Sequence, residues 1–219
     1  MNTFFSRYGS IRARIDDACG TVGRDPAGVT LIAVSKNHGI DDIRALYDLG
    51  QRHFGESRLQ EAEPKIAALP ADVVWHFVGN LQSNKARKIA DLFAYVQSVA
   101  KESQMLELQK SHSETPVFIE CNIAEEPQKG GCFPEKLDDC ISLLLNYNCV
   151  RLYGLMTVGP AMRNPEAMRP FFRKMRELRD SLAPGTALSM GMSADYDVAI
   201  QEGSTHVRIG TALFGPRKT

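Results

Sequence analysis

The feature that most constrains the fold is a repeated pairing: a short run of β-branched or aromatic residues followed by a longer segment of helical periodicity. Such an alternation favours a parallel β/α architecture. The runs that we interpret as strands are VTLIAV at 29–34, RHFGE at 52–56, VVWHFVG at 73–79, YVQSVA at 95–100, PVFIECN at 116–122, RLYGLMTV at 151–158, ALSMG at 187–191 and THVRIG at 205–210. Eight strands alternating with helices predict a closed (β/α)₈ barrel, a TIM barrel, rather than an open doubly wound sheet.

The segments between these runs have the spacing of amphipathic helices. We predict helices near 41–49, 57–68, 82–90, 101–111, 134–146, 165–182 and 194–202. An extra helix over 3–20 is predicted before the first strand, with an apolar face formed by Phe4, Tyr8, Ile11 and Ile15. The chain has 219 residues and no low-complexity linker, and a barrel of this kind needs about 200–250 residues. We therefore expect residues 1–219 to form a single domain.

Charge and cysteine content exclude several classes of protein. The chain has 26 basic and 26 acidic residues, so no overall electrostatic attraction to nucleic acid or to an anionic membrane is expected. The N-terminal sequence mixes charged and apolar residues, from which we expect no signal peptide, no transmembrane span and a cytoplasmic protein. The five cysteines form no Cys-x-x-Cys pair, so we expect them to be reduced thiols. The histidines lack the spacing of metal ligands, so no metal site is predicted.

Lys36 is the first candidate for a chemical role, because it closely follows the first predicted strand. In β/α barrels the reacting groups lie just beyond the C-terminal ends of the strands. One interpretation is that the lysine extends to the rim of the barrel and is solvated there, as most lysines are. The other is that a partly desolvated amine attacks a carbonyl group to form a Schiff base. The position of Lys36 alone leaves both alternatives open.

A second candidate lies near the C-terminus. Ser193 begins the short helix predicted after the seventh strand, and Gly210 and Thr211 end the eighth strand. Barrel enzymes often bind a phosphate there, where free N–H groups and hydroxyl groups meet an anion. The alternative is that the glycines only form turns. A phosphate site together with an amine suggests a single cofactor that carries both a phosphate and a carbonyl group.

Several segments carry a family resemblance. They are LIAVSKNHGIDDIRAL, QRHFGESRLQEAEPKI, WHFVGNLQSNKARKIA, LYGLMTVGP and LSMGMSADYDVAIQEGSTHVRIGTALFG. Together they resemble the YggS/PROSC family of pyridoxal-phosphate (PLP) homeostasis proteins, over a range from about residue 31 to near the C-terminus. The resemblance implies a single barrel like the N-terminal domain of alanine racemase, which is the fold-type III PLP fold.

The resemblance also implies roles for individual residues. Lys36 in AVSK matches the lysine that holds PLP as a Schiff base, and Arg208 in RIGT matches the residue that faces the pyridine nitrogen. The residues that match phosphate-binding positions are Ser193, Gly210 and Thr211, and those that match the lining of the pocket are His76 and Met156. Ser57, which follows the predicted strand at 52–56, is a further expected cofactor-binding residue. The family commonly has Asn at this position, and the shorter serine would shorten or lose the side-chain contact to the cofactor. The chain also departs from the family pattern at Tyr196, where Met is usual.

Arg208 bears on whether such a protein turns over a substrate. A guanidinium group donates hydrogen bonds and accepts none, so a pyridine nitrogen that faces it remains unprotonated. Such a ring is a weak electron sink and stabilises a carbanion poorly, whereas capture of the aldehyde by Lys36 is unaffected. Binding is thereby favoured over catalysis, and no catalytic residue is assigned.

The resulting hypothesis is a protein that holds PLP reversibly on Lys36, maintains vitamin B6 and amino-acid balance, and hands the cofactor to apo forms of PLP-dependent enzymes. A monomer or a weak dimer is expected. The chain is also too short for the second domain that supplies the opposing catalytic tyrosine in the racemases it resembles. The alternatives are a fold-type III PLP enzyme, such as an amino-acid racemase or decarboxylase, and a phosphate-binding barrel enzyme that does not use PLP.

Overall fold

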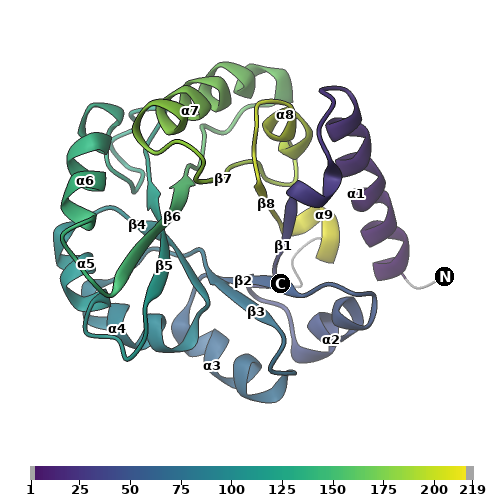
Figure 1. The fold of residues 1–219 in the computed structure, drawn as a ribbon. Coiled ribbons are helices and arrows are strands. Elements are labelled where there is room, and N and C mark those ends of the chain that lie inside the picture. Colours follow the sequence, from purple (N-terminus) through teal and green to yellow (C-terminus); the bar gives the residue numbers. More distant parts are fainter. Residues whose placement is uncertain (1–2, 216–219) are drawn as a thin grey trace.

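A closed barrel of eight parallel strands forms the centre of the molecule in the computed structural model, which describes residues 3–215 (Figure 1). The strands are β1 (Thr30–Val34), β2 (His53–Glu56), β3 (Val74–Phe77), β4 (Tyr95–Val99), β5 (Thr115–Glu120), β6 (Val150–Met156), β7 (Ala187–Ser189) and β8 (His206–Ile209). Each strand pairs in parallel with the next, and β8 pairs with β1 to close the ring. The predicted TIM barrel is confirmed.

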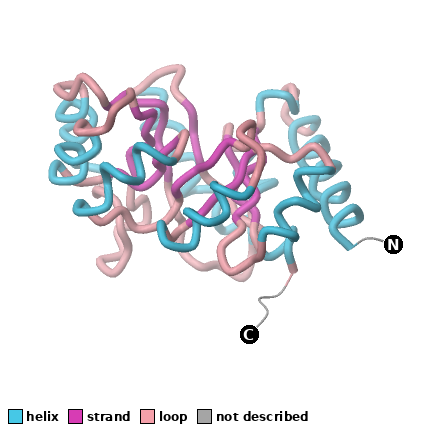
Figure 2. The backbone as a smooth tube through the Cα atoms, turned by 90° about the horizontal axis from the view of Figure 1, so that it is seen from below, coloured by secondary structure: helices cyan, strands magenta, loops and turns pink. Residues whose placement is uncertain are grey.

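Helices surround the barrel, and Figure 2 shows the strands enclosed by them. They are α1 (Thr3–Gly20), α2 (Ile40–Asp48), α3 (Leu59–Ala68), α4 (Ser83–Leu92), α5 (Glu102–Leu108), α6 (Leu137–Leu144), α7 (Arg169–Leu182), α8 (Tyr196–Gln201) and α9 (Thr211–Phe214). Short 3₁₀ turns occur at Pro26–Gly28, Pro134–Lys136 and Pro165–Met168. Two of these turns form the first residues of the predicted helices at 134–146 and 165–182, because proline favours a helix start but provides no N–H group.

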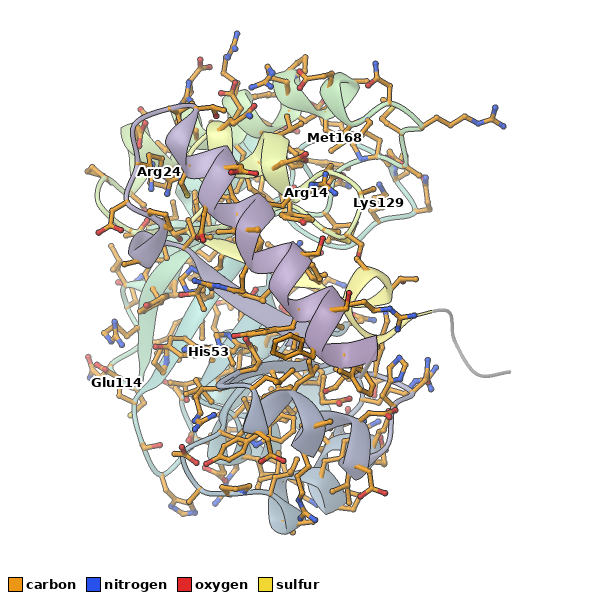
Figure 3. The ribbon with its side chains drawn as sticks, turned by 90° about the vertical axis from the view of Figure 1, so that its right-hand side faces the viewer. Arg14, Arg24, His53, Glu114, Lys129 and Met168 are labelled. Carbon is orange, nitrogen blue, oxygen red and sulfur yellow. The ribbon has the colours of Figure 1, made fainter. Side chains whose placement is uncertain are left out.

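Helix α1 is the predicted N-terminal helix. Its Ile11 and Ile15 side chains are buried against the barrel helices. Arg14, labelled in Figure 3, forms an ion pair with Asp197 and lies over the ring of Tyr196, with 4.8 Å between the guanidinium carbon and the ring centre. Tyr196 is therefore buried beneath α1 at the start of α8.

Two further sequence predictions can be compared with this fold. All five cysteines are free thiols, as expected. Within residues 3–215, no helix combines the length and the apolar character that crossing a membrane requires.

The barrel interior contains several polar side chains in place of the branched apolar residues that fill most TIM barrels. His76, Gln97, Ser189 and Arg208 come from four different strands and are all buried. Buried polar groups of this kind require hydrogen-bond partners. The partners of Arg208 form one side of the site at the C-terminal end of the barrel.

Candidate functional site at the C-terminal end of the barrel

Lys36 lies in a turn two residues after β1 and is half-buried. Among the residues that the structure describes, none forms a hydrogen bond or an ion pair with its side chain. The same end of the barrel carries two other lysines, Lys101 and Lys129, which line a cavity there. The Lys129 ammonium donates to Glu126 at 2.7 Å and to the carbonyl oxygen of Gly159 at 2.8 Å. Lys129 is thus engaged by two acceptors of the protein, whereas the Lys36 amine has no such partner among the described residues.

The backbone on both sides of Lys36 is held by two charged groups, Lys65, which is buried, and Glu61, which is partly exposed. Lys65, on α3, donates to the carbonyl oxygen of Ser35 at 3.0 Å and to Glu61 Oε1 at 2.8 Å. Glu61 Oε1 also accepts the backbone N–H of Asn37 at 2.5 Å. Asn37 has a positive φ of 64°, a conformation that asparagine tolerates better than most residues. The residues before and after Lys36 are therefore tied to one helix.

Glu56, at the end of β2, completes this ionic cluster. Its Oε1 accepts from the Ser35 hydroxyl at 2.6 Å and from the Lys65 ammonium at 2.8 Å. Its Oε2 is buried and has no hydrogen-bond partner among the described residues. Burial raises the pKa of the Glu56 carboxyl, although hydrogen bonds from Lys65 and Ser35 act in the opposite direction. The cluster thus contains one ammonium group between two carboxyl groups, beneath the turn that presents Lys36.

The C-terminal loops bring together the three residues predicted to bind phosphate. Gly210 and Thr211 lie at the start of α9, and the Ser193 hydroxyl accepts the backbone N–H of Ala212 at 3.2 Å. Gly210 also approaches β1: a Cβ atom built on it would lie 3.4 Å from the carbonyl oxygen of Val34. The predicted phosphate-binding residues therefore adjoin the strand that leads to Lys36.

The loop before Ser193 depends on glycine. Gly191 has a φ of 92°, and a Cβ atom there would lie 2.6 Å from the Ala199 Cβ atom. Asp195 accepts the N–H of Met192 at 2.7 Å and stabilises the same turn. The position of Ser193 thus follows from close packing of this loop on α8.

Arg208 lies on β8 and lines a cavity of about 410 Å³ at the same end of the barrel. Its Nη1 donates to the Ser189 hydroxyl at 2.5 Å, and its Nη2 donates to the carbonyl oxygen of Thr157 at 2.8 Å. Burial lowers the pKa of Arg208 to about 10, against the attraction of Glu120 and Asp195. The guanidinium group is still charged at neutral pH.

The other predicted site residues fall into different places. Met156, at the end of β6, lines the same cavity as Arg208. Ser57 instead lines a separate cavity of about 160 Å³, between the first turns of α3 and α4, which it shares with Asn80. His76 is fully buried inside the barrel and is connected to Arg208 only through other side chains. Tyr196 packs on α1 and keeps a structural role.

Sequence reasoning did not assign a role to Ser189, Gln97 or Lys65, which support the site from beneath. Ser189 is the one polar side chain in the run ALSMG, and Gln97 stands beside Ser98 in the run YVQSVA. Strands of a parallel sheet are buried on both faces, so an inward polar position gives no alternation of polar and apolar residues. A polar residue within such a run is the one signal that could have identified them.

Within residues 3–215 no group of three or more His, Cys, Asp or Glu residues could hold a metal ion.

Comparisons with known proteins agree with this geometry. The sequence profile of the alanine racemase N-terminal domain matches residues 8–218. A pyridoxal phosphate homeostasis protein from Aquifex aeolicus is 40% identical over 222 residues, which cover 97% of each chain. The protein of the same name from Pseudomonas aeruginosa is 41% identical over 225 residues, which cover 99% of this chain and 97% of the relative.

A solved structure shows the same fold. PipY from Synechococcus elongatus, with PLP bound, superposes with a TM-score of 0.78 and 35% sequence identity, over 92% of this chain and 100% of PipY. Sequence and fold thus lead to the same assignment over nearly the whole chain. The chain belongs to the alanine racemase N-terminal domain family and, within it, to the pyridoxal phosphate homeostasis proteins.

Proposed function

We propose that this protein binds PLP at the C-terminal end of the barrel, with Lys36 as the residue that captures it, and thereby maintains the supply of PLP without catalytic turnover. The observation that carries the proposal is the Lys36 amine, which has no hydrogen-bond or ion-pair partner among residues 3–215. It is presented by a turn whose two flanking residues are tied to Lys65 and Glu61. PLP carries an aldehyde, a phosphate and a pyridine ring, and each has a suitable neighbour at this end of the barrel.

The residues present fit the chemistry of PLP. When bound, PLP supplies an aldehyde that condenses with a lysine amine with loss of water. Lys36 supplies that amine, while the Ser193 hydroxyl, Thr211 and the close approach of backbone at Gly210 suit a phosphate. Met156 and Arg208 line the cavity that would receive the ring.

Arg208 supports holding rather than turnover. Its guanidinium group donates hydrogen bonds and accepts none, and its two Nη atoms already donate to Ser189 and Thr157. A ring nitrogen facing it would accept a hydrogen bond and stay unprotonated, so a carbanion would gain little stabilisation. We propose that the protein limits free PLP and delivers it to apo forms of PLP-dependent enzymes, in the cytoplasm, as a monomer or a weak dimer.

The direct test is to add PLP to the purified protein, record the visible absorbance, reduce with borohydride and map the modified lysine by peptide mass spectrometry. We expect modification of Lys36, and its loss in Lys36→Ala. Lys101 and Lys129 are internal controls, because both line the cavity. Modification confined to either control, or no modification at all, would contradict the proposal. Sustained conversion of an amino acid that Lys36→Ala abolishes would favour the enzyme alternative instead.

A further inference from the structure

A chain of hydrogen bonds crosses the barrel interior from Arg208 to His53. Ser189 Oγ lies 2.5 Å from Arg208 Nη1 and 2.7 Å from Gln97 Oε1. Gln97 Nε2 lies 2.9 Å from His76 Nδ1, and His76 Nε2 lies 3.0 Å from His53 Nδ1. The five residues come from β8, β7, β4, β3 and β2. His53 begins β2 and so marks the N-terminal end of the barrel, and Figure 3 shows it on the side opposite Lys129, which lines the cavity.

The direction of every hydrogen bond in this chain follows from its first member. Arginine has only donors, so the Ser189 oxygen accepts from Arg208 and its O–H donates to Gln97 Oε1. The Gln97 amide nitrogen then donates to His76 Nδ1, which must be unprotonated. His76 therefore carries its proton on Nε2 and donates to His53 Nδ1. One charged group thus sets the tautomer of a histidine three hydrogen bonds away.

Within residues 3–215, the side chains of Gln97 and His76 form no hydrogen bonds besides those of this chain. His76 is fully buried, and two rings lie near it: Tyr95 stacks on it at 4.6 Å between centres, and His206 lies at 6.3 Å. Burial, together with the neighbouring His206 and His53, holds the pKa of His76 well below its ordinary value. His76 is therefore neutral, and its two nitrogens are committed to Gln97 and His53.

We propose that Ser189, Gln97 and His76 are positioning residues for Arg208, which orient its guanidinium group toward the ring-nitrogen position of the cofactor. This role rests on the proposed function, because it concerns how Arg208 meets PLP. A guanidinium group held by neutral acceptors keeps its full charge and has a fixed plane, which a loosely packed arginine lacks. Each hydrogen bond in the chain restricts the side-chain orientation of the next residue.

The first test concerns the chain itself and needs no cofactor. Nitrogen-15 NMR of the histidine side chains, on protein freed of PLP at neutral pH, distinguishes the two neutral tautomers. We expect the His76 Nε2–H tautomer, and we expect it to be weakened or lost in Gln97→Leu. The Nδ1–H tautomer in the wild-type protein would overturn the proposed direction of the chain.

The second test concerns PLP. Ser189→Ala removes the acceptor from Arg208, and we expect PLP binding to weaken about fivefold and the absorbance maximum of the bound cofactor to shift. Ser189→Thr, which keeps the hydroxyl group, should restore both. The matched control is Ser111→Ala, since Ser111 is also a buried serine and donates to Asp91 at 2.8 Å, far from the site. The control should change neither quantity.

The outcomes separate this inference from the proposed function. If the wild-type protein captures PLP on Lys36 but Ser189→Ala binds it with unchanged affinity and absorbance, the positioning role is wrong and the proposed function stands. If the wild-type protein captures no PLP, the proposed function fails and the positioning role fails with it.

Discussion

The two sides of the open end of the barrel each bury a cation, but they hold it in opposite ways. Beneath β1 and β2, Lys65 donates to two carboxyl groups, Glu56 and Glu61. On β8, Arg208 donates to a hydroxyl oxygen and a carbonyl oxygen. Glu120 and Asp195 attract Arg208 electrostatically, but neither forms an ion pair with it within residues 3–215.

This difference in partners gives the two cations different roles: Lys65 stabilises the structure, and Arg208 can interact with a ligand. The charge of Lys65 is balanced within the protein and holds the turn that presents Lys36. The charge of Arg208 is not balanced by a contacting carboxylate, so it is available to an acceptor on a ligand, and the lowering of the pKa of Arg208 reflects the cost of burying it. Mutation should therefore affect stability on the first side and ligand affinity on the second.

The largest effect is expected from Lys65→Met. Removing one partner of a buried ion pair leaves Glu56 without its counter-ion, which should lower the free energy of unfolding by about 3 kcal/mol at neutral pH. The matched control is Lys88→Met, because Lys88 forms an exposed ion pair with Glu63 and should change stability by about 0.5 kcal/mol or less. Chemical denaturation measures both. Equal losses in the two variants would show that the buried cluster has no special role.

Arg208→Met should act mainly on the ligand. Loss of a hydrogen bond from a charged donor should weaken PLP binding by about 10- to 150-fold, as measured by absorbance titration. Arg173→Met, which changes a half-exposed arginine on α7, should leave the affinity unchanged. If Arg208→Met bound PLP as tightly as the wild-type protein, Arg208 would not be part of the binding site.

Ser193→Ala tests the phosphate-binding loops and should have a smaller effect. Loss of one neutral hydrogen bond should weaken PLP binding by about five- to tenfold. Binding of pyridoxal, which has no phosphate, should be unchanged. The two titrations together assign the interaction, because an equal loss for both ligands would place Ser193 away from the phosphate.

The smallest effect concerns the pH dependence of the ionic cluster. The pKa of Glu56 is raised by burial, so the folded state binds this proton more tightly than the unfolded state. The stabilisation is complete below the unfolded pKa, which is about 4.3, and is lost as the pH rises through the folded pKa. The stability of the wild-type protein relative to Glu56→Gln should therefore fall in denaturation experiments as the pH rises from the unfolded pKa through the raised folded pKa. A relative stability that rises over this range would contradict the assignment.

Much of the fold could be predicted from local sequence patterns. The eight strand runs and the helix over 3–20 occur where the structure has them, because β-branched runs and helical periodicity reflect burial on one or two faces. The juxtaposition of Ser193 with the start of α9 also agrees with the expectation that loops after the seventh and eighth strands of a barrel meet.

The supports of the site could not be predicted in this way. Lys65 looks like any lysine on an amphipathic helix, yet it is buried beneath Ser35, thirty residues earlier in the chain. Ser57 looks like a residue at the end of a strand that should face the site, but it lines a different cavity. Periodicity records which face of an element is buried and carries no information about which residue lies opposite.

For this protein, the sequence alone determined the barrel, its order of elements, the place of Lys36 just after β1 and that of Arg208 on β8, because these depend on local patterns and on a family resemblance. Only the tertiary structure decided which buried polar groups meet. Ser189 and Gln97 are 92 residues apart in the chain and bond to each other inside the barrel. Buried polar groups must find partners wherever the closed sheet places them, and that closure is a property of all eight strands together.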